Sequence, residues 1–111
     1  MTVLMTVYNG EPYLYEAVAS ILAQTYRDFR FLILDNASTD NSRGVIRSFN
    51  DPRIKLVELP ENIGLVAALN RGLEMIDTPF VARMDADDIS LPTRLEKELN
   101  ELQNSPPPRL P

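Results

Sequence analysis

The sequence predicts an α/β domain of three layers, with a parallel β-sheet between two layers of helices. Short apolar runs typical of buried strands alternate four times with segments whose apolar residues recur at helical spacing. This alternation favours parallel strands joined by right-handed crossovers, with helices on both faces of the sheet. The 111 residues, of which 44% are hydrophobic, are enough for one domain with a modest core.

The first two strand–helix units fill the first half of the chain. Residues 2–7 form an apolar run that predicts a strand, and Pro12 follows near the first turn of a helix. The helix is predicted by apolar residues at i, i+4, i+7 and i+8, namely Leu14, Val18, Ile21 and Leu22. Residues 29–34 are almost continuously apolar, as in a strand buried on both faces. A short second helix follows, with Ser38 expected as its N-cap and Asp40 expected to help its first turn.

The last two units repeat the pattern. Residues 54–59 predict a third strand, which lies nearer a sheet edge because charged residues interrupt it. Apolar spacing over residues 65–76 predicts a third helix, and residues 80–84 predict a fourth strand. A fourth helix is marked by Leu95, Leu99 and Leu102. We therefore expect residues 1–104 to form the domain and the proline-rich residues 105–111 to form a disordered tail.

The expected strand order is 3-2-1-4. Ligands of such sheets bind beyond the carboxyl ends of the strands, at the point where the strand order reverses. In this order the reversal lies between strands one and four, so Tyr8 and Asp85 would end neighbouring strands. The sequence therefore predicts that any site lies at this edge of the sheet.

Three carboxylates are crowded at the end of the fourth predicted strand, on Asp85, Asp87 and Asp88. Like charges this close resist ionising together, and a hard divalent cation such as Mg²⁺ or Mn²⁺ removes that conflict while bridging carboxylates to phosphates. One interpretation is therefore a metal–diphosphate site. The alternative is a solvated acidic loop that caps the next helix, since Asp near a helix N-terminus is favourable.

Other polar residues follow the neighbouring strands. Tyr8 could stack on a nucleobase and offer one hydrogen bond, or it could close the top of the core. Asp35 and Asn36 could bind base or ribose edges, or they could serve turn geometry. Gly64 could let the backbone approach a ligand, or it could simply fit a turn. Each of these signals is open to both interpretations when taken alone.

Composition excludes several classes of function. The net charge of −5 argues against nucleic acid as a partner, and an anionic sugar nucleotide would be repelled unless a cation came with it. The chain contains no cysteine and no histidine, which excludes disulfides, thiolate or histidine metal sites and histidine-dependent triads. No G-x-G-x-x-G or P-loop lysine motif is present, which disfavours NAD enzymes and P-loop NTPases. No apolar run approaches the roughly 18 residues of a transmembrane segment and no signal-peptide core is present, so the cytoplasm is the expected compartment.

Four motifs occur together along the chain. They are VLMTVYNGE at residues 3–11, SILAQTY at 20–26, DNASTD at 35–40 and MDADD at 84–88. Their order and spacing, up to about Leu102, resemble the family 2 glycosyltransferases of the GT-A fold. The resemblance implies a Rossmann-like three-layer sandwich, truncated relative to the family's domain, that forms the nucleotide-sugar-binding half of the enzyme. It also implies that Thr6 and Tyr8 line the base pocket, with Asp35 and Asn36 near uracil and ribose.

The resemblance further implies a reaction. A sugar would pass from a nucleotide-diphosphate donor, with a UDP-sugar expected, to a glycan or lipid-linked acceptor. Asp87 would bind Mn²⁺ or Mg²⁺, and Asp85 would contact the ribose or the metal and its waters. The cation would neutralise the diphosphate leaving group, and the family inverts the anomeric centre by direct displacement. The full-length enzyme would lie in the cytoplasm or at the inner membrane surface.

The chain departs from the family's pattern in two ways. Asn36 stands where the family usually has a second Asp, and if it contacts the base, Asn36→Asp is expected to tighten uridine nucleotides. The acceptor half, which would hold the catalytic base, is absent after the fourth helix, so no catalytic residue is assigned and the chain alone is not expected to transfer sugar. Residues 80–84 would then form an exposed sheet edge that favours self-association.

Three rival interpretations stay open. The chain could be a binding module that holds metal and nucleotide but transfers nothing. It could be a sugar-nucleotide pyrophosphorylase, although that class would need a glycine-rich basic loop where residues 8–12 stand. It could also be a structural product of truncation that binds nothing.

Overall fold

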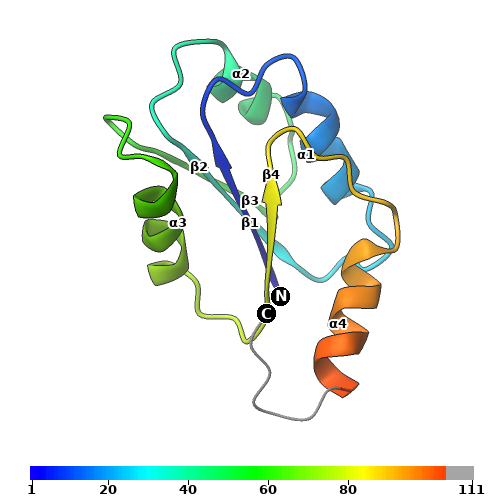
Figure 1. Ribbon diagram of the computed structural model, residues 1–111. Coiled ribbons are helices and arrows are strands. Elements are labelled where there is room, and N and C mark those ends of the chain that lie inside the picture. The colour runs from blue at the N-terminus through cyan, green and yellow to red at the C-terminus, as the bar shows by residue number, and fades with distance from the viewer. Residues whose placement is uncertain (105–111) are drawn as a thin grey trace.

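The computed structural model describes residues 1–104, and the predicted tail over residues 105–111 lies outside them. Strands and helices alternate along the chain as the sequence predicts (Figure 1). The elements are, in order, β1 (Thr2–Val7), α1 (Leu14–Leu22), β2 (Arg30–Asp35), α2 (Ser42–Arg47), β3 (Ile54–Glu58), α3 (Leu65–Glu74), β4 (Val81–Asp85) and α4 (Arg94–Asn104).

The four strands form one parallel sheet in the order β3-β2-β1-β4, which confirms the predicted topology. Val7 of β1 lies opposite Asp35 of β2, and Thr6 lies opposite Asp85 of β4. The order reverses between β1 and β4, so the residues that follow these two strands meet at one edge of the sheet. Within residues 1–104, β3 and β4 are the outer strands. Self-association through β4 stays a prediction.

One face of the sheet is covered by α1, α2 and α4, which lie apart from α3 in Figure 1. These helices bury Ile21, Ile46 and Leu95 in one cluster with alternate strand residues such as Met5 and Ile33. Successive side chains of a strand point to opposite faces, so the intervening residues face the other layer. The strands are apolar on both faces because helices cover both.

The other face of the sheet is covered by α3. Leu4 and Leu34 are buried there, with Leu69 of α3 packed against them. A Cβ atom at Gly72 would lie 2.7 Å from Leu4 Cδ1 and 3.1 Å from Leu34 Cδ1. Glycine at this position therefore lets α3 lie close to the sheet.

Strand boundaries differ from the prediction by one residue. β2 and β4 begin and end one residue later than predicted, at Asp35 and Asp85, and β3 ends one residue earlier, at Glu58. The apolar runs of β2 and β4 end before these acidic residues, but the sheet continues because strand pairing uses backbone groups and not side chains.

The predicted cap of α2 is wrong. Asn41, and not Ser38, occupies the N-cap position, and it makes no side-chain capping bond. The hydroxyl of Ser38 instead donates to Asp35 Oδ1 at 2.6 Å. The expected help from Asp40 is present, since the backbone N–H of Ser42 donates to Asp40 Oδ1 at 3.0 Å. Within residues 1–104, no helix combines the length and the apolar character that crossing a membrane requires.

Candidate nucleotide and metal site

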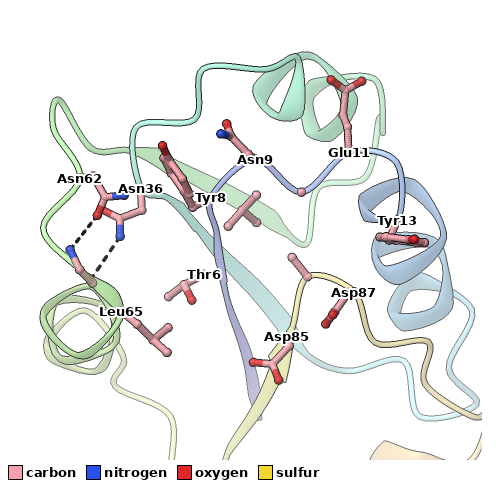
Figure 2. Close-up of a pocket in the computed structure, with 14 residues that line it drawn as sticks. Thr6, Tyr8, Asn9, Glu11, Tyr13, Asn36, Asn62, Leu65, Asp85 and Asp87 are labelled. Carbon is pink, nitrogen blue, oxygen red and sulfur yellow. Dashed lines mark hydrogen bonds between the residues drawn. The ribbon is translucent and has the colours of Figure 1, made fainter.

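A cleft of about 590 Å³ opens where β1, β2 and β4 end (Figure 2). Its walls are formed by the loop after β1, by the residue that follows β2, by the residues at the start of α3 and by the end of β4. This volume lies in the range of small-molecule sites. We call it the strand-end cleft, and its lining residues are Thr6, Val7, Tyr8, Asn9, Gly10, Glu11, Tyr13, Asn36, Asn62, Gly64, Leu65, Asp85, Ala86 and Asp87.

The topology brings together residues that are far apart in the sequence. Of the seven residues predicted for the site, those that line the strand-end cleft are Thr6, Tyr8, Asn36, Gly64, Asp85 and Asp87. In Figure 2 the two aspartates lie across the cleft from Asn36, with Thr6 between them. The seventh predicted residue, Asp35, does not line the cleft.

The acidic cluster consists of Asp85, Asp87 and Asp88, all exposed. Each offers one carboxylate oxygen, and these oxygens lie within 4.8 Å of one another. Oxygen ligands on opposite sides of a Mg²⁺ ion stand about 4.2 Å apart, since each lies about 2.1 Å from the metal. Small side-chain rotations would therefore bring the three oxygens around one ion. Hard divalent cations such as Mg²⁺ and Mn²⁺ prefer such carboxylate donors, so the cluster fits the predicted metal.

None of the described residues that line the strand-end cleft is basic. Its charged lining residues are Glu11, Asp85 and Asp87, and none is Lys or Arg. Arg83 lies outside the lining, with its guanidinium 3.7 Å from Asp85 Oδ1. A diphosphate that entered alone would meet only like charge. A cation bound at these carboxylates would offset that repulsion.

Asp35 is fully buried, and its carboxylate is held by protein groups. Oδ2 accepts from Arg43 Nε at 2.6 Å and from the backbone N–H of Ser38 at 3.1 Å, while Oδ1 accepts from the Ser38 hydroxyl. With β2 extended to Asp35, the two-residue period puts this side chain on the face of Phe31 and Ile33, beneath α2. That period would have predicted the inward orientation if the strand had been taken one residue further.

Asn36 lines the strand-end cleft and also ties two loops together. Its Oδ1 accepts from the backbone N–H of Ile63 at 2.9 Å, and its Nδ2 donates to Gly64 O at 3.2 Å. Figure 2 shows this amide directed at the backbone just before α3. Gly64 has a φ of 85°, a conformation that favours glycine. Asn36 therefore helps to fix the wall that Gly64 and Leu65 form.

We expect Asn36→Asp to lower stability without tightening uridine nucleotides. Aspartate keeps an acceptor for Ile63 N, but its second oxygen would face the acceptor Gly64 O in place of a donor. Leaving such a buried group without a partner costs about 1–3 kcal/mol. Urea unfolding and nucleotide calorimetry would measure both effects. Asn62→Asp is the matched control, because Asn62 Oδ1 only accepts, from Gly64 N at 2.8 Å. Preferential tightening of uridine nucleotides in Asn36→Asp would contradict this expectation.

Eight other residues that line the strand-end cleft were not among the predicted site residues. They are Val7, Asn9, Gly10, Glu11, Tyr13, Asn62, Leu65 and Ala86. All of them lie at strand ends, in the loops that follow or at helix starts, at the same edge of the sheet. The rule that parallel sheets bind ligands at this edge could have found them as a group, but not their individual orientations.

Asp40 lies next to the loop after β1 without lining the cleft. Its partial burial acts to raise the pKa of the carboxyl, but hydrogen bonds from the Ser42 hydroxyl and from the backbone N–H groups of Ser42 and Glu11 outweigh this and lower the pKa. Because its pKa is lowered, the Asp40 carboxyl is ionised at neutral pH. The hydrogen bonds to the ionised carboxylate therefore stabilise the fold above the unfolded-state pKa, and this stability is lost as the pH falls through the folded-state pKa.

The curated relatives of this chain include the UDP-Glc:alpha-D-GlcNAc-diphosphoundecaprenol beta-1,3-glucosyltransferase WfgD of Escherichia coli. That enzyme is 33% identical over 100 residues, which are 90% of this chain and 40% of the relative. The chain spans about a third to two fifths of the length of the curated relatives it matches.

Solved structures share the fold. TarS of S. aureus in complex with UDP-GlcNAc superposes with a TM-score of 0.85 at 24% identity, over 92% of this chain and 30% of that one. The mannosyltransferase PcManGT from Pyrobaculum calidifontis, in complex with GDP-Man and Mn²⁺, superposes with a TM-score of 0.71 at 32% identity, over 78% and 27% of the two chains. The model of the family described as "Glycosyl transferase family 2" matches residues 2–107. Because that match spans nearly the whole chain, this protein belongs to glycosyl transferase family 2.

Proposed function

We propose that this chain forms the donor-binding part of a glycosyltransferase that uses a nucleoside diphosphate sugar, with UDP-sugar as the favoured donor. The observation that carries the proposal is the cluster of exposed carboxylates beside a cleft with no basic lining residue. Such a cleft suits a diphosphate only together with a divalent cation. The UDP-Glc donor of WfgD, a 33% identical relative, supports a UDP-sugar donor, and the Mn²⁺ in the PcManGT structure supports the metal.

Six residues that line the strand-end cleft receive roles in this proposal. Asp87 and Asp85 would hold Mn²⁺ or Mg²⁺, with Asp85 also within reach of the ribose. A cation bound there would neutralise charge that develops on the diphosphate leaving group. Tyr8, 52% exposed, offers its ring as a platform for the base, with Thr6 nearby. Gly64 and Asn36 form the facing wall.

Asp35 receives a supporting role in place of the base contact that the resemblance implies. Its carboxylate accepts from Arg43 and Ser38, and its side chain is buried beneath α2. We propose that it fixes the loop after β2 and so acts on the nucleotide only through its neighbours.

The proposed reaction is an inverting displacement in which an acceptor hydroxyl attacks the anomeric carbon. It requires a base within hydrogen-bond reach of that hydroxyl. Glu11 accepts from Asn41 N at 2.8 Å, and Asp85 and Asp87 are assigned to the metal. We therefore assign the base, and the contacts to a glycan or lipid-linked acceptor, to parts of the longer family enzymes that this chain does not match. The acceptor named in WfgD, a lipid-linked sugar, supports that acceptor class.

A calorimetric titration tests the proposed donor and metal. UDP should bind measurably with Mn²⁺ or Mg²⁺ present and lose that affinity in EDTA, because the cleft without a cation repels the diphosphate. GDP measured in parallel would test the preference for uridine. Equal affinity for UDP in EDTA would contradict the metal-dependent site. A radiolabelled donor assay with mixed acceptors then separates transfer from binding alone, and we expect the 111-residue chain to bind without transfer.

A further inference from the structure

Two loops at the strand-end cleft are interlocked by reciprocal hydrogen bonds. In the loop after β1, the backbone N–H groups of residues 9, 10 and 11 donate to side chains of the loop after β2 and the start of α2. Asn9 N donates to Ser38 Oγ at 2.9 Å, Gly10 N to Ser42 Oγ at 2.8 Å, and Glu11 N to Asp40 Oδ2 at 3.2 Å. In return, the backbone N–H groups of residues 39, 40 and 41 donate to side chains of the first loop: Thr39 N and Asp40 N to Asn9 Oδ1 at 2.8 and 3.2 Å, and Asn41 N to Glu11 Oε1 at 2.8 Å.

The interlock fixes one wall of the strand-end cleft. Residues that line this wall are Tyr8, Asn9, Gly10, Glu11 and Tyr13, all from the loop after β1 or the start of α1. Irregular backbone has no ladder to satisfy its N–H groups, so its position depends on such side-chain partners. In Figure 2 the side chains of Asn9 and Glu11 extend toward the loop after β2.

Asp40 occupies a central position in the interlock. Its Oδ2 accepts from Glu11 N, and its Oδ1 accepts from the Ser42 hydroxyl at 2.6 Å. Because Ser42 gives its one hydroxyl proton to Asp40, its oxygen is left to accept from Gly10 N. Ser42 is fully buried, so water cannot replace these partners. Gly10 O in turn accepts from Leu14 N at the start of α1.

We infer that Asp40 is a positioning residue for the nucleotide. Asp40 orders the loop that carries Tyr8, because it accepts from Glu11 N directly and orients the Ser42 hydroxyl that accepts from Gly10 N. The inference rests on the proposed function for its ligand and assigns a role to a residue outside the strand-end cleft. Asp40 does not itself line the cleft and does not belong to the acidic cluster, so its removal acts on the base side of the site through the loop after β1 and leaves the metal side unchanged.

The test compares nucleotide and metal binding in variants of the whole chain. Asp40→Ala should weaken UDP binding in the presence of Mn²⁺ by roughly tenfold, the size expected when hydrogen bonds to a charged group are lost. Binding of Mn²⁺ alone should stay unchanged. Asp40→Asn keeps one acceptor oxygen and should fall between the wild type and Asp40→Ala. Ser42→Ala should weaken UDP similarly, and the double variant should lose little more than either single one, because the two residues act in one chain of hydrogen bonds.

Asp51→Ala is the matched control. Asp51 also accepts from a backbone N–H and from a side chain, both of Arg53, at 2.9 and 3.0 Å, but it lies before β3 and away from the cleft. Its removal should cost stability without changing UDP affinity. Equal losses of UDP affinity in Asp40→Ala and Asp51→Ala would overturn the inference, because they would indicate a general structural effect.

Amide hydrogen exchange gives a measurement that needs no ligand. Exchange at Gly10 and Glu11 should accelerate at least roughly tenfold in Asp40→Ala, since these amides lose their acceptor or its orientation, while Leu32 and Ile33 in the sheet should not change. Unchanged exchange at Gly10 and Glu11 would overturn the inference whether or not UDP binds. A wild-type chain that binds no UDP with Mn²⁺ would contradict the proposed function instead.

Discussion

Asp87→Ala is expected to abolish the metal dependence of nucleotide binding. Asp87 belongs to the acidic cluster and also lines the strand-end cleft, where it can contact a metal and a diphosphate together. The loss of Mn²⁺ affinity should exceed roughly 10- to 100-fold, which is the loss typical when a residue that only hydrogen-bonds to a metal ligand is removed. UDP affinity should then be the same, and low, in Mn²⁺ and in EDTA. Calorimetry with Mn²⁺ alone and with Mn²⁺ and UDP would measure both effects.

Asp88→Ala is the matched control for this prediction. Asp88 is in the same cluster and is also exposed, but it does not line the strand-end cleft. We therefore expect a smaller loss of Mn²⁺ affinity and retained metal dependence of UDP binding. Neither variant should lower the free energy of unfolding of the metal-free protein, because each removes one of several crowded like charges. Metal-dependent UDP binding that survives in Asp87→Ala would contradict the assignment of this residue.

The largest expected effect on stability belongs to Arg43→Met. Arg43 Nε donates to the fully buried carboxylate of Asp35 at 2.6 Å, and Arg43 Nη2 donates to the carbonyl oxygen of buried Leu59 at 3.0 Å. Removing one partner of a buried ion pair leaves an uncompensated charge, which costs about 3–5 kcal/mol. Arg43 is itself 31% exposed, so we expect the lower end, about 3 kcal/mol of unfolding free energy. Urea unfolding followed by circular dichroism would measure the change.

Arg47→Met provides the comparison on the same helix. Arg47 pairs with Glu58 across α2 and β3, but its side chain is 61% exposed. Exposed pairs contribute about 0–1 kcal/mol, so this variant should unfold almost like the wild type. Equal losses of unfolding free energy in the two variants would show that the burial of Asp35 does not set the cost of removing its arginine partner. UDP affinity measured on the folded Arg43→Met protein would also separate a supporting role of Asp35 from a direct contact with the base.

The order of the elements could be predicted because it depends on local patterns. Apolar residues of α1 recur at 3.6-residue spacing, and the interiors of β1 and β2 are largely apolar because helices cover both faces of the sheet. Alternation of strands and helices then restricts the topology to a few parallel sheets. The position of the acidic cluster follows from the same logic, since Asp85 ends a strand next to β1. For these features the sequence by itself was sufficient.

The direction of side chains at the strand ends was decided only by the tertiary structure. Asp35 and Asn36 are adjacent in the sequence, yet Asp35 turns inward to Arg43 and Asn36 turns to the backbone of residues 63 and 64. Which way each points depends on where the ladder with β1 ends and on which loops arrive beside it. One residue more or less in the strand exchanges the two faces.

The interlock of the two loops shows the same limit. Asn9 and Asp40 are 31 residues apart, and Gly10 and Ser42 are 32 apart. Each residue taken alone is an ordinary turn residue, because Asn, Asp and Ser side chains commonly bond nearby backbone. These side chains also bind distant backbone groups, because the parallel pairing of β1 and β2 places both loops at the same edge of the sheet. The sequence determined which polar groups the loops carry, and the packing of the sheet decided which of them meet.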